Sequence, residues 1–314
     1  MPDQPQQTSP APADCPYDYD QAFSRHRGLI DVSEQERLKC TRVAIAGVGG
    51  IGGHHAATLA RTGLGRFVLA DFDHYELHNM NRQYGASIGT LGRNKAEVMR
   101  DILHGINPEA EVRLMTRPLD RNSIDPFLEG ADIVIDALDI MAQTARRALL
   151  AAARERGIPA FSAAPLGFGG AVFHYHPEGM SYDEFAGLED GMSERQMLLH
   201  FLCAIGAQGP HLKYMDTSGI GCEGGTAPSL GLACQIGACM VATDVVAHLL
   251  GRRTPRWVPR FAQFDPYGRS YRERYRPWGA RNPLQRLRMA VLRRRLPALA
   301  QDQPVAAAPA GQAG

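Results

Sequence analysis

The sequence predicts an α/β protein whose doubly wound, mostly parallel sheet ends in a C-terminal β-hairpin and a helical extension. Two observations carry this prediction. Short apolar runs alternate with longer helical patterns over residues 41–156, and strands separated by helices form parallel sheets. A glycine-rich turn at residues 47–52 joins the first apolar run to the first helical pattern. This unbroken succession of strand, turn and helix is typical of a Rossmann-like unit.

Each expected element has a local signal. The apolar run at 42–46 is too short for a helix, Asn107-Pro108 ends a helix, and residues 265–268 (DPYG) form a turn between two late strands. The expected strands are 42–46, one ending at Asp71, 111–116, 132–136, 159–163, 171–175, 260–264 and 269–275, and the main helices are the one after the glycine turn, 92–106, 143–156, 193–205, 233–250 and 283–299.

Composition divides the chain into a folded part and flanking segments. Residues 1–17 are rich in Pro, Gln, Ser and Ala and predict a disordered leader. Residues 18–276 form the expected folded domain, 277–299 a basic amphipathic helix, and 300–314 a disordered tail. Within the domain, the regular pattern loosens after residue 177, and such a long excursion usually carries function or mobility.

Charge and cysteine content exclude several classes of protein. The net charge of +1 gives no overall field for nucleic acid or an anionic membrane. The six cysteines are scattered and contain no C-x-x-C pair, so neither a secreted disulfide framework nor a structural zinc site is expected. The N-terminal residues lack the pattern of a signal peptide, and we find no uninterrupted apolar run that would span a bilayer. We therefore expect a cytoplasmic protein without a membrane partner.

The glycine turn predicts a nucleotide site. Gly47, Gly49 and Gly52 have the G-x-G-x-x-G spacing, with Gly50 between them. In such a turn the glycines permit a tight bend, close approach of backbone to phosphate, and close packing of helix on strand. The helix start offers unpaired N–H groups to an anion, and Asp71 ends the next strand, where a carboxylate can bind ribose hydroxyls. The pattern alone fits NAD, FAD or ATP.

Further motifs resemble one family. The pattern D-F-D-x-x-x-x-x-N-x-N-R-Q spans residues 71–83, and G-R-N-K-A at 92–96 and D-A-L-D at 136–139 follow it. Together with the glycine turn they resemble the ThiF/MoeB-type adenylyltransferases, relatives of the ubiquitin-activating enzymes. The resemblance covers residues 21–276, roughly the whole expected domain, and keeps the family's order of motifs.

The resemblance implies that the protein forms an acyl-adenylate from ATP and a carboxylate, with Mg²⁺. That reaction needs cations around a triphosphate and a carboxylate that holds the metal. The implied roles are phosphate contacts for Arg82 and Lys95, magnesium binding for Asp139, ribose binding for Asp71, orientation of the nucleotide for Asn79, and support for Asp73 and Gln83.

The sequence also departs from the family pattern. Ile140 stands where the family usually has Asn after D-A-L-D, and the C-x-x-C zinc ligands of many relatives are missing, so no zinc is expected. Arg25 lies where relatives carry an arginine that reaches the ATP of the other subunit, which implies a homodimer. The helix at 233–250 is a candidate interface. Cys222 matches a position where some sulfur-carrier activators hold a reactive cysteine, although a buried structural thiol is equally compatible with its glycine-rich surroundings.

Several acceptors and functions stay open. The resemblance implies the C-terminus of a small ubiquitin-like or sulfur-carrier protein, or of a peptide, with recognition expected in residues 167–219. A tRNA threonylcarbamoyladenosine dehydratase is an alternative that the arginines of residues 283–299 would suit, although contact with tRNA is less expected. From other classes, an NAD-dependent oxidoreductase would share Asp71 and the glycine turn without needing Arg82 and Lys95. An inactive binding scaffold would need none of them.

Overall fold

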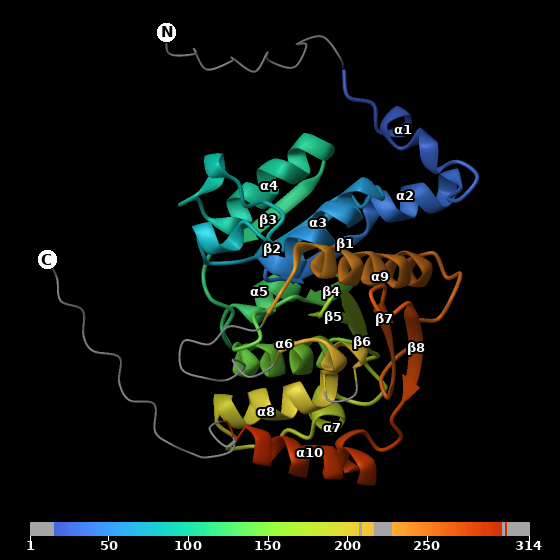
Figure 1. Cartoon of the computed structure of the whole chain (residues 1–314). Helices are drawn as coiled ribbons and strands as arrows, with labels where there is room; N and C mark the ends of the chain where they lie inside the picture. The colour runs from blue at the N-terminus through green and yellow to red at the C-terminus, as the bar shows by residue number, and fades with distance from the viewer. Residues whose placement is uncertain (1–15, 207–208, 217–227, 297–298, 300–314) are drawn as a thin grey trace, which may run out of the picture.

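An eight-stranded sheet runs through the computed structural model, which describes residues 16–206, 209–216, 228–296 and 299. Its strand order is β3-β2-β1-β4-β5-β6-β7-β8 (Figure 1). The strands are β1 (Arg42–Ala46), β2 (Arg66–Ala70), β3 (Glu111–Met115), β4 (Ile133–Asp136), β5 (Ala160–Leu166), β6 (Gly169–Tyr175), β7 (Arg260–Asp265) and β8 (Ser270–Tyr275).

The sheet changes from parallel to antiparallel at β5. Strands β3, β2, β1, β4 and β5 pair in parallel, whereas β6, β7 and β8 each run antiparallel to the strand before them. The two strands expected around residue 165 form a hairpin, and the late hairpin extends the same sheet rather than standing apart from it. The predicted fold class, a mostly parallel doubly wound sheet with a C-terminal hairpin, is confirmed.

Helices cover both faces of the sheet (Figure 1). Alternation along the strands explains why: in β1, Val43 and Ile45 face one hydrophobic cluster, whereas Ala44 and Ala46 face another. The first cluster includes residues of α2, α3, α4 and α9, and the second includes residues of α5, α6, α7 and α8. The main helices are α2 (Val32–Cys40), α3 (Gly50–Arg61), α4 (Lys95–Ile106), α5 (Ile124–Leu128), α6 (Gln143–Glu155), α7 (Tyr182–Ala186), α8 (Glu194–Ile205), α9 (Gly231–Leu249) and α10 (Pro283–Arg295), and α1 (Tyr19–Ala22) precedes them.

The C-terminal helix α10 lies outside the second layer. It packs against α8, so the order outward from this face of the sheet is α6, α8 and α10 (Figure 1). Asn282 caps its start by accepting a hydrogen bond from the N–H of Leu284 at 3.0 Å. The helix ends at Arg295, four residues before the predicted end.

Helix α9 is long and largely apolar. Among the described residues it is the helix that is long and apolar enough to cross a membrane by length and composition. This helix does not contradict the expectation of no uninterrupted apolar run, because Gln235, Thr243, Asp244 and His248 interrupt residues 231–249. Because α9 packs against α3 and the strands β5 and β6, its composition also suits a core helix.

Candidate active site

The glycine turn is shaped by steric contacts with the neighbouring strand. Gly47 has a φ of +86°, and a Cβ there would lie 2.4 Å from the carbonyl oxygen of Ala137. A Cβ at Gly52 would lie 1.9 Å from the carbonyl oxygen of Gly47. Neither position admits a side chain, because the obstructing atoms are backbone. The turn therefore holds the start of α3 in close contact with the residues that follow β1 and β4.

The middle of the turn is open. The atoms nearest to a Cβ at Gly49 belong to the side chain of Gln83, the first of them at 3.5 Å. Gly49 is also the N-cap of α3, and no side chain caps this helix. The N–H groups of its first turn are thus available to an anion in the cavity, which Gly49 and Gly50 line.

Asp71 follows β2 and holds the turn in place. Its Oδ2 accepts a hydrogen bond from the N–H of Val48 at 2.8 Å, and its Oδ1 accepts one from the N–H of Asp73 at 3.0 Å. Burial raises the pKa of Asp71 above its ordinary value, although these two N–H groups counteract the effect. The carboxylate thus has one structural task, and it lines the cavity where a ribose would need a hydrogen-bond acceptor.

Lys95 and Asp73 form an ion pair at the cavity wall. The Nζ of Lys95 lies 3.0 Å from Oδ2 of Asp73, and the side chain of Lys95 is 8% exposed. The pair is positioned locally, because Lys95 is the first residue of α4 and its N–H donates to the carbonyl of Asp73 at 2.9 Å. The ammonium group is therefore held in a largely buried position, where the attraction for a negative charge in the cavity would be weakly screened.

Arg82 and Gln83 come from the loop between β2 and α4. Both line the cavity. Arg82 is only loosely held, since its Nη1 donates to the carbonyl of His78 at 3.0 Å and to Oδ1 of Asn81 at 3.2 Å. Gln83 is buried, and its Oε1 has no hydrogen-bond partner among the described residues. These two side chains add a positive charge and an unpaired acceptor beside the glycine turn.

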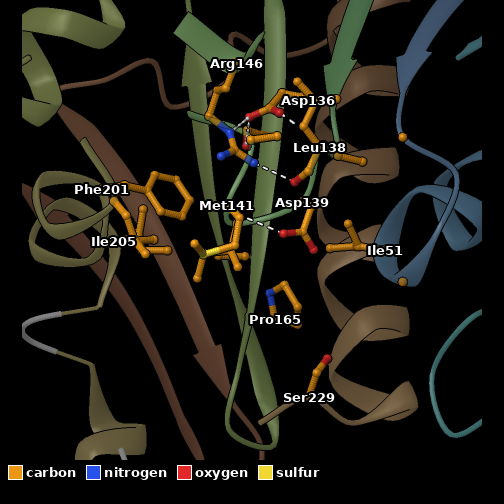
Figure 2. Close-up of a pocket in the computed structure, with 18 of the residues that line it drawn as sticks. Ile51, Asp136, Leu138, Asp139, Met141, Arg146, Pro165, Phe201, Ile205 and Ser229 are labelled. Carbon is orange, nitrogen blue, oxygen red and sulfur yellow. Dashed lines mark hydrogen bonds and ion pairs between the residues drawn. The ribbon is translucent and has the colours of Figure 1, made fainter. Parts of the chain in front are cut away.

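Asp139 lies exposed at the end of β4. It lines the cavity, and one of its oxygens, Oδ1, accepts a hydrogen bond from the N–H of Met141 at 2.9 Å. Figure 2 shows its carboxylate between Ile51 and Met141. Because Mg²⁺ at nucleotide sites is commonly held by one or two carboxylates together with phosphate oxygens and water, an exposed carboxylate at this position fits that ion. The described residues contain no group of three His, Cys, Asp or Glu side chains that would hold a metal unaided.

A buried ion pair supports the end of β4. Arg146 on α6 donates from Nε to Oδ2 of Asp136 at 2.9 Å and from Nη2 to the carbonyl of Leu138 at 2.6 Å (Figure 2). Ser162 donates to the same Asp136 oxygen at 3.1 Å. Burial is the largest single effect and lowers the pKa of Arg146. The charge and hydrogen bond of Asp136, together with Tyr182 and Tyr175, outweigh it, so the pKa of Arg146 is raised.

The sequence analysis missed Arg146, although a signal for it is present. Arg146, Leu149, Leu150 and Ala153 occupy one buried stripe of α6 with helical spacing. A charged residue on an otherwise apolar stripe predicts a buried partner, because an unpaired buried charge is costly. Asp136 is that partner, rather than only the last residue of a strand.

Most of the side chains described above line a cavity of about 1100 Å³ at the carboxyl ends of the parallel strands. It has a polar half and an apolar half. The polar half is lined by Gly47, Gly49, Gly50, Asp71, Asp73, Arg82, Gln83, Lys95, Asp136 and Asp139. The apolar half is lined mainly by Leu138, Ile140, Met141, Leu198, Phe201, Leu202, Ile205, Leu287, Val291, Leu292 and Leu296.

Some predicted site residues lie elsewhere. Asn79 is buried and uses Oδ1 to accept the N–H of Glu76 at 3.0 Å, and it does not line the cavity. Arg25 is exposed and also lies outside the cavity lining. Cys222 lies outside the described residues, so its proposed thiol chemistry stays a hypothesis.

Cys234 lines the cavity instead, although the sequence analysis treated residues 233–250 only as a candidate interface. A Cβ at Gly50 would lie 3.7 Å from its Sγ. Burial raises the pKa of this thiol above its ordinary value, which disfavours the reactive thiolate.

The fold and the cavity define a nucleotide-binding α/β protein whose site lies where a glycine turn, a strand-end carboxylate and two cations meet. The chain belongs to the ThiF family, which it matches over residues 23–287.

Relatives of known name match part of the chain. The tRNA threonylcarbamoyladenosine dehydratase of Bacillus subtilis (strain 168) is 40% identical over 118 residues, 37% of this chain and 46% of that protein. The sulfur carrier protein ThiS adenylyltransferase of Escherichia coli (strain K12) is 32% identical over 157 residues, 49% of this chain and 62% of that protein. This chain therefore spans about half the length of such relatives.

Solved structures share the fold over a longer stretch. PaaA superposes with a TM-score of 0.64 at 24% identity, covering 86% of this chain and 87% of that one. The MccB of E. coli, solved with MccA-N7isoASN, superposes with a TM-score of 0.60 at 20% identity, covering 79% of this chain and 67% of that one. At these identities the likeness concerns the fold.

Proposed function

We propose that the protein is an ATP-dependent adenylyltransferase that activates a carboxylate as an acyl-adenylate. The observation that carries this proposal is the gathering of Asp71, Arg82, Lys95 and Asp139 around one cavity beside an uncapped helix start. Two cations and a helix N-terminus suit a polyphosphate. An NAD site needs the turn and Asp71 but not this concentration of positive charge.

In the proposed reaction a carboxylate oxygen of the acceptor attacks the α-phosphorus of ATP. A bond forms between that oxygen and phosphorus, the bond from the α-phosphorus to the bridging oxygen breaks, and pyrophosphate leaves with the electron pair. Arg82 and Lys95 neutralise the charge that develops on the phosphate oxygens. Asp139 would hold Mg²⁺, which would supply further charge neutralisation when bound. Asp71 orients the ribose, and the first turn of α3 holds a phosphate.

A second candidate within the family is a tRNA threonylcarbamoyladenosine dehydratase. It is favoured by the match to the B. subtilis dehydratase at 40% identity. It would begin with the same activation of a carboxylate, so the polar half of the cavity suits both candidates. The two candidate functions differ in the molecule that carries the carboxylate, and the residues of the polar half do not distinguish between such molecules.

We also propose that the protein works as a homodimer. The outward face of α9 carries Leu232, Ile236, Cys239 and Met240, which border a surface hollow of about 460 Å³ together with Phe264. Exposed apolar residues around a hollow suit a second copy of the same helix. The proposed role of Arg25 is to reach the ATP of the partner, since it lies outside the cavity of its own chain.

Nucleotide binding and pyrophosphate exchange test the proposed activity. Calorimetry should show ATP with magnesium binding to the wild type and NAD binding poorly. With carrier, peptide and tRNA acceptors supplied in turn, one of them should stimulate exchange of labelled pyrophosphate into ATP. Lys95→Ala and Arg82→Ala should each lower that exchange by about tenfold to a thousandfold, the scale of losing one charge-stabilising group.

Arg61→Ala is the control, because Arg61 is exposed at the end of α3 and lies outside the cavity lining. It should leave exchange unchanged. Tight binding of NAD without binding of ATP would refute the proposed function.

A further inference from the structure

The cavity is larger than a nucleotide requires. Its volume of about 1100 Å³ exceeds the range of roughly 300–1,000 Å³ that encloses one drug-sized ligand. The carboxyl ends of β1 and β2 and the glycine turn account for the polar half only. The apolar half extends away from them to α8 and α10, whose side chains line it.

Two helices line the apolar half with continuous stripes. On α8, Leu198, Phe201, Leu202 and Ile205 follow the i, i+3, i+4, i+7 spacing of one helix face. The stripe of α10 is Leu287, Arg288, Val291, Leu292 and Arg295. Leu287 is 60% exposed and Val291 is 44% exposed. Large apolar side chains left open beside a nucleotide site indicate a ligand with apolar groups.

Positive groups interrupt this apolar surface. Arg288 and Arg295 line the cavity, and neither side chain makes an ion pair or a hydrogen bond with another described residue. Arg146 contributes a third donor where the halves meet. Its side chain is 4% exposed, it lies against the ring of Phe201 at 4.6 Å, and its Nη1 has no partner among the described residues (Figure 2). A buried donor without a partner is costly, and an oxygen of the ligand would satisfy it.

From these observations we infer that the apolar half binds the terminal segment of a peptide with bulky apolar residues next to its reacting carboxylate and an acidic group further along. This inference rests on the proposed adenylation activity and names its acceptor. The apolar side chains lie against α8 and α10, the acidic group lies near Arg288 and Arg295, and a peptide oxygen accepts from Arg146.

The same surface disfavours the other acceptors. A carrier ending in two glycines would leave the stripes of α8 and α10 uncovered. A tRNA would bring hydrated phosphates against Leu287 and Val291, whereas proteins usually contact nucleic acid through basic and polar groups. Two arginines in a largely apolar wall match an acidic apolar peptide better than a polynucleotide.

Calorimetry with defined probes tests the inference. The first probe is an acetylated hexapeptide with leucine and phenylalanine before its free carboxylate and one glutamate upstream. The second has serine in place of both apolar residues, the third ends in two glycines, and the fourth is a short RNA hairpin. The first peptide should bind at least about tenfold more tightly than the second and third, the scale expected for burying an apolar side chain.

Matched variants of α10 locate the binding surface. Leu287→Asn should weaken binding of the first peptide about fivefold to tenfold. Leu284→Asn should not, because Leu284 is similarly exposed, at 52%, but lies outside the cavity lining. Arg288→Gln should weaken binding about threefold, and less at high salt. Arg286→Gln should leave it unchanged, since Arg286 is exposed outside the cavity.

Binding of ATP, measured on the same samples, separates this inference from the proposed function. If ATP binds while both peptides bind equally, or while Leu287→Asn has no effect, the acceptor inference is wrong and the proposed function stands. If the RNA hairpin binds more tightly than the first peptide, and Arg288→Gln abolishes that binding, the surface is assigned to RNA instead. If the wild type binds no ATP, the proposed function fails.

Discussion

Arg146 and Asp136 form an ion pair with 2.9 Å between Nε and Oδ2, and their side chains are only 4% and 2% exposed. The pair connects α6 to the last residue of β4, three residues before Asp139. The position of Asp139 in the cavity therefore depends on an interaction that lies behind it.

We predict that Asp136→Asn lowers the free energy of unfolding substantially, and that Asp136→Ala lowers it by about 3–5 kcal/mol, because removing one partner leaves a buried charge uncompensated. Urea denaturation measures both values. Asp101→Ala is the control, since the Arg93–Asp101 pair, at 2.6 Å, is largely exposed. Its loss should cost about 1 kcal/mol or less. Equal losses for the buried and exposed pairs would contradict this prediction.

Gly52→Ala is expected to destabilise the fold and weaken ATP binding. The new Cβ would lie 1.9 Å from the carbonyl oxygen of Gly47, so the turn must move, at a cost of about 1–3 kcal/mol. Gly105→Ala is the matched control within α4, because a Cβ there would meet nothing within 4 Å. That substitution should raise the free energy of unfolding by about 0.5–1 kcal/mol, because Ala is favoured over Gly within a helix. Thermal unfolding should thus shift in opposite directions for the two variants.

Adenosine affinity should decrease as the pH falls toward the raised pKa of Asp71. Burial raises the pKa of Asp71 above its ordinary value of 3.8, and the protonated carboxyl is a weaker acceptor for ribose hydroxyls. Adenosine is the suitable probe, because it has no phosphate that titrates. Affinity should fall as the pH drops toward the raised pKa, and Asp71→Asn should bind weakly without this dependence. An unchanged pH profile in Asp71→Asn would assign the titration to another group.

The raised pKa of Asp71 also determines how this carboxyl changes the free energy of unfolding with pH. Since the folded pKa of Asp71 lies above the unfolded one, the folded chain binds this proton more tightly. The resulting contribution to the free energy of unfolding is fully present below the unfolded pKa, and it is lost as the pH rises through the folded pKa.

Mixed dimers test whether Arg25 acts on the partner. Arg25→Ala and Lys95→Ala chains should each be nearly inactive in pyrophosphate exchange. In a mixed dimer, one site would then have Lys95 from its own chain and Arg25 from the other, so activity should return to that site. Differently tagged chains allow the mixed dimer to be purified. A mixed dimer without recovery would contradict the trans role.

The core of the fold could be predicted from the sequence because its signals are local. Residues 42–46 form β1 as expected, and the glycine turn leads into α3. The strand ends at 46, 70 and 136 then bring their following residues to one edge of the sheet, as parallel strands do. This explains why Asp71 and Asp139 line one cavity although the chain between them is long.

The rest of the site depends on packing between distant segments. The sequence analysis placed acceptor recognition in residues 167–219, and α8 lies within that range. It gave no such role to α10, whose basic residues instead suggested tRNA. Only the packing of α10 on α8 brings Leu287 and Arg288 to the cavity. No local pattern encodes that contact, just as none pairs Arg146 with Asp136.

The position of α10 has an evolutionary consequence. The ThiF family match ends at residue 287, so Arg288, Val291, Leu292 and Arg295 line the cavity from beyond it. The residues that line the polar half lie inside the match. If α10 binds the acceptor as we propose, a relative with a different helix at this position would accept a different carboxylate while the polar half stays the same. For the same reason α10 is a natural segment to exchange or randomise when redirecting the protein toward other carboxylates.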